Sequence, residues 1–229
     1  MGRILDLSGP LYEGMWDYRG LTGIPEALPA FRSAAIATVA ADGFEAFDYR
    51  LSSITGTYIE TGGHMLPDMP ALADLPPDAF MRPAVVCHVP RKGPEEVIRR
   101  AELEAHCPPV EPGDALLIEC GWGERWARPE FVTGSPAFHV DCLPWFLSRP
   151  FAILGVDVPC IESARSRPSE GDATGNMLLP IFARGALLLA PLVNLDRATA
   201  ARGRLVALPL HIRAVSGAPC RALLIEGDN

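Results

Sequence analysis

The stretch VEPGDALLIECGW covers residues 110–122 and contains the pattern that decides the fold class. Pro-Gly-Asp at 112–114 is a turn signal, and the apolar run ALLIE follows it at 115–119. A short apolar run bounded by turn residues is typical of a strand buried in a sheet. We therefore predict a buried strand at residues 115–119.

Similar runs recur on both sides of this stretch. Apolar segments rich in branched residues predict further strands at residues 4–7, 34–39, 84–89, 151–156, 186–192, 205–212 and 221–225. Helices are predicted at residues 95–106, 142–147 and 176–184, and residues 66–83 form the longest predicted loop. The chain of 229 residues is 48% hydrophobic, so we expect one strand-rich α/β domain over residues 1–229.

Charge and composition narrow the classes of partner. The net charge is −8, and the longest basic run is Arg99-Arg100, so the sequence favours neither nucleic acid nor an anionic membrane as a partner. A charged N-terminus and the lack of a long apolar run predict a cytoplasmic protein. Six cysteines without a C-x-x-C spacing predict reduced, structural thiols; they are Cys87, Cys107, Cys120, Cys142, Cys160 and Cys220.

Residues 54–64, ITGTYIETGGH, contain the densest group of chemically useful side chains. If the segment is extended, Tyr58, Glu60 and His64 point to the same face, with glycines between them. A phenol, a carboxylate and an imidazole would then line one surface. The alternative is a strand end whose polar groups only satisfy one another or the backbone, and the residues alone leave both interpretations open.

The spacing of this segment resembles the signature of the cyclase family, which includes kynurenine formamidase and isatin hydrolase. That signature is His-x-Gly-Thr-His-x-Asp-x-Pro-x-His; Gly56, Thr57 and His64 match it directly, and Glu60 matches in charge. Six further segments resemble family elements in the same order. They are residues 4–15, 83–90, 110–122, 151–163, 186–196 and 205–226. The resemblance implies a strand-rich cyclase-like fold of the swivelling β/β/α type.

The resemblance also implies a divalent metal, zinc or manganese, held by the family's histidines and acidic residues. The first three ligand positions of the motif are here Ile54, Tyr58 and Glu60, and a downstream ligand pair aligns with Leu178 and Ala190. Only Glu60 and His64 remain as metal donors, whereas divalent transition metals generally take three or four protein ligands. We therefore expect a metal requirement that is reduced, altered or absent.

The activity that the resemblance implies is hydrolysis of a small cyclic amide, formamide or lactone. Glu60 would act as general base toward water, and Tyr58 or His64 would polarise the carbonyl or protonate the leaving group. Two alternatives stay open. The chain is a catalytically silent relative that binds a small molecule or a partner, or it holds one metal through Glu60, His64 and a further ligand.

The resemblance adds candidates for substrate binding and for assembly. Trp16 and Tyr18 lie in MWDYRG at residues 15–20, a segment that in the family lies near the active site and often at a subunit contact. Thr57 of the motif is the third candidate for binding the small-molecule substrate. Trp122 is more consistent with core packing. Family members are usually homodimers or larger, so a homo-oligomer, dimer or tetramer, is expected.

Overall fold

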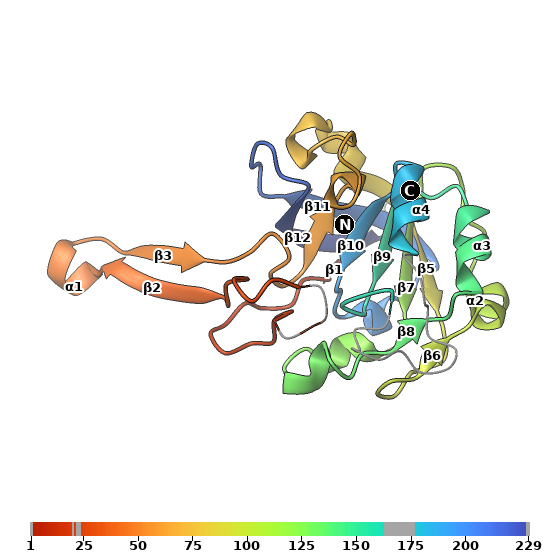
Figure 1. The fold of residues 1–229 in the computed structure, drawn as a ribbon, viewed down its shortest axis with the longest axis horizontal. Coiled ribbons are helices and arrows are strands. Elements are labelled where there is room, and N and C mark those ends of the chain that lie inside the picture. Colours follow the sequence, from red (N-terminus) through yellow and green to blue (C-terminus); the bar gives the residue numbers. More distant parts are fainter. Residues whose placement is uncertain (1, 20, 22–23, 163–176, 228–229) are drawn as a thin grey trace.

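The computed structural model describes residues 2–19, 21, 24–162 and 177–227, and its main feature is an eight-stranded sheet (Figure 1). The strand order is β1-β12-β11-β5-β7-β9-β10-β4, and β4 also pairs with β12. The second pairing closes the strands from β12 to β4 into a ring, with β1 added outside it. The strands are β1 (Arg3–Asp6), β4 (Tyr58–Glu60), β5 (Met81–His88), β7 (Ala115–Glu119), β9 (Ile153–Val156), β10 (Leu187–Ala190), β11 (Arg202–Pro209) and β12 (Gly217–Glu226).

Strands β5, β7, β9 and β10 are parallel neighbours and form the most deeply buried part of the sheet. All residues of β7, β9 and β10 are buried. Parallel strands covered on both faces are apolar throughout, which explains why they appear in the sequence as unbroken apolar runs. By contrast, β11 and β12 are antiparallel and mix buried with exposed positions.

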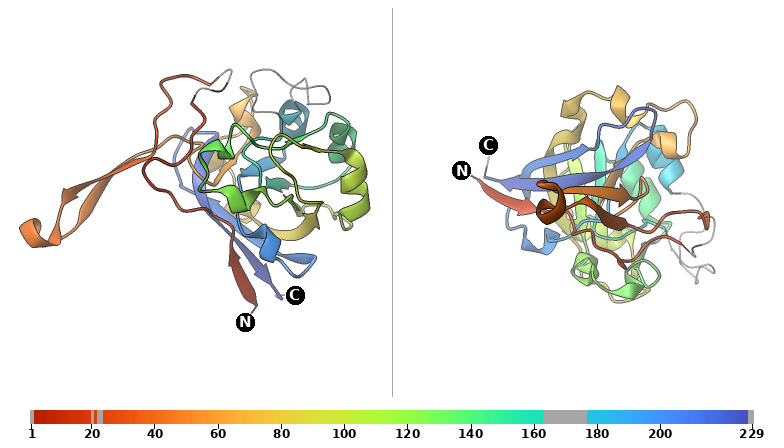
Figure 2. Two further views of the ribbon diagram at one scale, coloured as in Figure 1. Left: turned by 90° about the horizontal axis from the view of Figure 1, so that it is seen from below. Right: turned by 90° about the vertical axis from the view of Figure 1, so that its left-hand side faces the viewer.

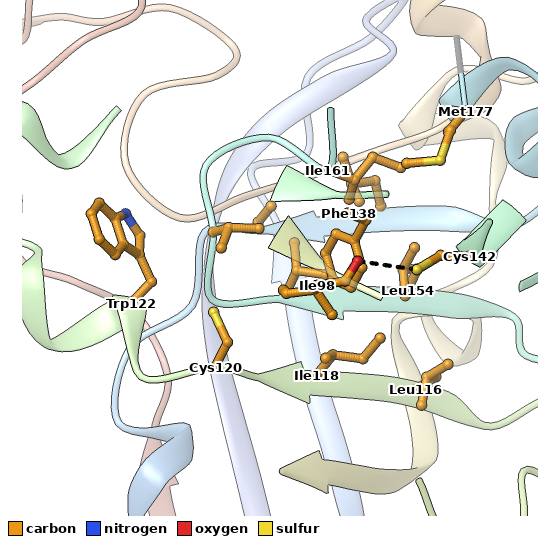
Figure 3. Close-up of a cluster of buried hydrophobic side chains, with 14 of the residues drawn as sticks. Ile98, Leu116, Ile118, Cys120, Trp122, Phe138, Cys142, Leu154, Ile161 and Met177 are labelled. Atoms are coloured by element: carbon orange, nitrogen blue, oxygen red, sulfur yellow. Dashed lines mark hydrogen bonds between the residues drawn. The ribbon is translucent and has the colours of Figure 1, made fainter. Parts of the chain in front are cut away.

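Buried side chains form separate clusters on the two faces of the sheet. The larger cluster includes Ile98, Phe138 and Leu154 (Figure 3). It lies on the face that is covered by the helices α2 (Arg100–His106), α3 (Cys142–Leu147) and α4 (Leu178–Ala183). Alternation along β4 places Tyr58 in this cluster and Ile59 in the other. The side chain of Glu60 therefore points to the same side as that of Tyr58.

A two-stranded ribbon projects far from the sheet (Figures 1 and 2). It consists of β2 (Arg32–Ala37), the short helix α1 (Val39–Asp42) and β3 (Ala46–Arg50), and we call it the arm. Thr38 caps α1, and Gly43 ends it in the left-handed conformation at a φ of 78°. The short helix at the tip of the arm is thus capped at both ends by residue types that are common at these positions.

The structure confirms the strand-rich α/β prediction; the strand predicted at residues 115–119 is observed with these bounds as β7, and the other seven predicted strands have shifted ends. It also adds the arm strand β3 and the pair β6 (Val97–Ile98) and β8 (Ala137–Phe138). The prediction of a helix at 95–106 is wrong in its first half, because Glu95 has a φ of 62° and the branched residues that follow it pair as β6. The helix predicted at 176–184 is observed as α4, and residue 176 lies outside the described residues.

The predicted loop at 66–83 is not irregular throughout. It contains the 3₁₀ turns η2 (Leu72–Asp74) and η3 (Pro77–Phe80), and β5 already begins at Met81. The remaining 3₁₀ turns of the described chain are η1 (Gly62–His64), η4 (Trp122–Arg125), η5 (Pro129–Phe131) and η6 (Leu195–Arg197). Among the described residues, no helix combines the length and the apolar character that crossing a membrane requires.

Candidate active site

Strand β4 holds the candidate site between two neighbouring strands. Glu60 lies opposite Leu188 of β10 on one side and Gly217 of β12 on the other. The carboxyl side chain is therefore enclosed, and Glu60 is only 2% exposed. A β-carbon at Gly217 would lie 3.2 Å from that of Glu60, so the glycine leaves the space that the glutamate occupies. This neighbour, distant in the sequence, was missed by the sequence analysis.

His64 reaches Glu60 through a tight turn. The Thr61 hydroxyl accepts a hydrogen bond from the Gly63 amide at 3.1 Å and donates one to the Pro70 carbonyl at 2.7 Å, which stabilises η1. This turn brings Nδ1 of His64 to 3.6 Å from Oε2 of Glu60. The expected proximity of Glu60 and His64 is present, but the expected extended backbone is wrong beyond Glu60, because residues 62–64 form a 3₁₀ turn.

Burial controls the protonation of this pair. Oε2 of Glu60 has no hydrogen-bond partner among the described residues, and burial raises the pKa of Glu60 to about 8. Burial also lowers the pKa of His64 below its ordinary value. At neutral pH, Glu60 is therefore mostly a neutral acid and His64 a neutral imidazole. Their contact is close but is not an ion pair.

Tyr58 and Tyr18 form the second polar element of the site. Their rings meet edge to face with centroids 6.5 Å apart. The Tyr18 hydroxyl donates to the carbonyl of Pro159 at 3.0 Å. Burial raises the pKa of both phenols well above the ordinary value, so both stay neutral.

Thr57 and Trp16 lie deeper in the wall of the site. The Thr57 hydroxyl donates to the Pro191 carbonyl at 2.7 Å and accepts from the Gly9 amide at 3.3 Å, so it joins β4 to two loops. Trp16 is 7% exposed and packs against Trp126 and the ring of Phe131, at centroid distances of 4.9 and 4.8 Å. Trp122 is fully buried, in agreement with its expected place in the core.

The positions aligned with the family's metal ligands converge on β4, but they carry few donors. Ala190 lies directly opposite Tyr58, and α4, which begins at Leu178, packs against the turn that carries His64. Glu60 and His64 are the remaining donors, and the described residues contain no group of three metal-ligating side chains. A divalent metal takes three or four such ligands, so the described residues do not fit the family's metal.

Cys160, which the sequence predicted only as a structural thiol, is a further group near the site. Burial, with smaller contributions from the charges of Glu162 and Glu60, raises the pKa of its thiol to about 12. Glu162 in turn accepts a hydrogen bond from the amide of Leu178 at 3.1 Å. The only sequence signal was its place directly after Pro159, in the segment that follows β9.

Fold and site together define a strand-rich α/β protein whose candidate active site is a buried carboxyl group beside an imidazole on a short strand. The sequence model of the Cyclase family matches residues 5–163. This span is more than half of the chain, and the chain therefore belongs to the cyclase family. The resemblance seen in the sequence is confirmed.

Three known proteins illustrate this similarity. Kynurenine formamidase of Bacillus cereus is 26% identical over 174 residues, which are 76% of this chain and 77% of that protein. Isatin hydrolase A from Labrenzia aggregata, bound to benzyl benzoate, superposes with a TM-score of 0.81 at 20% identity, over 99% of this chain and 94% of that one. A protein described as a potential metal-dependent hydrolase with cyclase activity superposes with a TM-score of 0.75 at 19% identity, over all of both chains.

Proposed function

We propose that this chain is a hydrolase of a small cyclic amide, formamide or lactone, and that Glu60 is its general base. The observation that carries the proposal is the buried Glu60 carboxyl group, with one unpartnered oxygen and a pKa of about 8. A general base is most effective when its pKa lies near the working pH. The names of the relatives, kynurenine formamidase and isatin hydrolase, support this substrate class.

In the proposed reaction, ionised Glu60 takes a proton from a water molecule as that water attacks the carbonyl carbon. Protonated Glu60 then returns the proton to the leaving nitrogen or oxygen. His64 polarises the carbonyl oxygen through its N–H group, since its side chain is 45% exposed and can meet a substrate. We assign this task to His64 in preference to Tyr58, because Tyr58 is only 5% exposed and the His64 side chain is far more accessible.

We propose that the reaction does not require the family's metal. The support is the donor set: Ile54, Leu178 and Ala190 offer no ligating atom, and Tyr58 offers only a buried neutral phenol. The test combines metal analysis of untagged protein with assays on formylkynurenine, isatin and simple lactones, before and after chelation. We expect turnover that a chelator leaves unchanged. Stoichiometric metal with turnover that a chelator abolishes would overturn this proposal and indicate an unrecognised ligand.

The second candidate function is a silent binder of a small molecule, and the loss of the family's ligand positions favours it. The same assays separate the two. If no substrate class is turned over, while titration calorimetry detects binding of the same compounds, the silent binder is the better description. Turnover that depends on Glu60 excludes it.

We propose that the chain assembles as a homo-oligomer through the arm. The arm exposes apolar side chains of Ile36, Val39 and Phe44, with exposed fractions of 70%, 67% and 59%. An isolated two-stranded ribbon is marginally stable in water, and exposed apolar patches mark interaction surfaces. A second copy is the partner that the family resemblance implies. We also propose a cytoplasmic location, which agrees with six cysteines that are all free thiols.

A further inference from the structure

Thr61 lies between the proposed base and its histidine, is 1% exposed, and bonds to other parts of the chain through each of its polar atoms. Its amide donates to the Ser216 carbonyl at 2.8 Å, and its carbonyl accepts from the His64 amide at 3.1 Å. Its hydroxyl donates to the Pro70 carbonyl at 2.7 Å and accepts from the Gly63 amide at 3.1 Å. Thr61 therefore ties the turn η1 to the loop that follows it and to the connection between β11 and β12.

The two glycines of η1 show how closely this turn is packed against its surroundings. A β-carbon at Gly63 would lie 3.2 Å from Oγ1 of Thr61 and 3.3 Å from Cβ of Ser216. A β-carbon at Gly62 would lie 3.2 Å from Cβ of Phe182 in α4. The turn thus lies directly against the Thr61 hydroxyl on one side and against α4 on another, and it has little room to shift.

The imidazole of His64 has few contacts of its own that could fix its place. Within the described part of the chain, no hydrogen bond holds the ring. Its neighbours are Oε2 of Glu60, 3.6 Å from Nδ1, and the ring of Phe182, with a centroid distance of 6.5 Å. The side chain is 45% exposed. The position of the ring is therefore inherited from the backbone of η1, and the bonds that hold η1 also determine where the ring lies.

We propose that Thr61 is a positioning residue, whose hydroxyl group holds the His64 imidazole in place beside Glu60 and toward the substrate. The effect on catalysis rests on the proposed function, whereas the effect on the imidazole does not depend on turnover. Loss of the hydroxyl removes both the bond that caps η1 and the bond to the following loop. A displacement of about 1 Å in a group that acts on the substrate can lower a rate about 10²-fold.

The first experiment separates the hydroxyl group of Thr61 from the shape of its side chain. Valine keeps the branched shape but can form neither bond, whereas serine keeps the hydroxyl. We expect Thr61→Val to lower kcat about 10–100-fold with little change in KM, and Thr61→Ser to retain most of the wild-type value. The matched control is Thr199→Val, which removes an exposed hydroxyl beside Glu226, at the opposite end of β12 from Gly217, and should leave kcat unchanged.

The second experiment observes the imidazole directly by NMR, without substrate. The chain contains five histidines, and the His64→Gln variant identifies the His64 signal in protein labelled with ¹³C at histidine. At one fixed pH, Thr61→Val should shift this signal, because the ring current of Phe182 acts on His64 according to the distance between the two rings. The signals of the other histidines, and all five in Thr61→Ser, should stay at their wild-type positions.

A His64 signal that stays at its wild-type position in folded Thr61→Val would overturn the proposal, whatever the value of kcat. If Thr61→Val does not fold, Gly63→Ala tests the same bridge, because its methyl group meets Oγ1 of Thr61 at 3.2 Å and should cause the same shift. An unshifted signal there would also overturn the proposal. Full turnover by His64→Gln would instead overturn the role of His64 in the proposed function, and the NMR signal would still decide the role of Thr61.

Discussion

At the scale of single residues, the site depends on one carboxyl group that is enclosed without a counter-charge. Desolvation of Glu60 disfavours the carboxylate, and the neighbouring His64 is also pushed toward its neutral form. The result is a pair of titratable groups that stay neutral in contact. This arrangement can accept a proton from water only after Glu60 ionises, which couples activity to pH.

The first prediction concerns activity. In the wild type, kcat/KM should rise with pH and level off above about pH 8, because the basic form of Glu60 accumulates above a pKa of about 8. Glu60→Gln should lower kcat/KM by roughly 10²–10⁴-fold and remove the rise. A pH–rate profile on the best substrate measures both. The control is Glu130→Gln at an exposed site, which should behave as the wild type.

The second prediction concerns stability. The folded pKa of Glu60, about 8, lies above the ordinary value of 4.5. The unfolded chain therefore loses this proton at lower pH than the folded chain does, so stability declines as pH rises between these values. The contribution is on the order of 3–5 kcal/mol across that window. Urea unfolding measures the free energy of unfolding of wild type and of Glu60→Gln. Because only the wild type loses stability through this group, the value for Glu60→Gln minus that for wild type should increase with pH. A difference that does not change with pH would contradict the prediction.

At the scale of elements, the site is made by strand pairing. The short strand β4 lies between β10 and β12, which come from the C-terminal part of the chain, and the residue opposite Glu60 on β12 is a glycine. The turn η1 then places His64 next to Glu60 and against Phe182 of α4, at a ring distance of 6.5 Å. The chemistry therefore depends on the register of β12 against β4 as much as on Glu60 itself.

The third prediction tests this register. In Gly217→Ala, the added methyl group meets Glu60 at 3.2 Å, and we expect a loss of about 1–3 kcal/mol in the free energy of unfolding, with lower activity. Denaturant unfolding and the substrate assay measure these effects. Gly93→Ala is the matched control, because the nearest atom to its new methyl group lies 3.7 Å away. Equal effects of the two substitutions would contradict the packing argument.

At the scale of the whole molecule, two features matter: the closed ring of strands and the arm outside it. Outside the ring, β1, near the start of the chain, pairs with β12, near its end, in register from Arg3 with Glu226 to Asp6 with Leu223. We propose that residues 1–229 unfold as one domain in a single transition, because the ends of the chain share one sheet. The arm carries apolar side chains far from this sheet (Figure 2).

The fourth prediction concerns the arm. Ile36→Ser combined with Val39→Ser should convert the oligomer to a monomer with little change in the stability of the monomer, because both side chains are exposed in the single chain. Light scattering after size exclusion measures the mass. Leu147→Ser on α3, an exposed leucine on the far side of the sheet, is the control and should leave the mass unchanged. A wild-type monomer at micromolar concentration would contradict the proposed assembly.

Much of the fold was predictable from the sequence, because buried parallel strands need continuous apolar runs such as residues 115–119. The same local logic failed at residues 95–99, where a residue at positive φ and pairing with β8 override the helical pattern. The arm strand β3 was missed because its exposed, mixed residues have no burial pattern to reveal it. Local patterns report burial reliably, and they report pairing between distant segments poorly.

By itself, the sequence determined the family, the strand-rich class and the candidate residues Tyr58, Glu60 and His64, because these follow from local patterns and motif spacing. Only the tertiary structure decided the state of those residues. The pKa of Glu60 depends on how completely water is excluded, and that exclusion comes from β10, β12 and the glycine at position 217. Solvent exclusion is a property of packed segments that are distant in the chain, so no motif contains it.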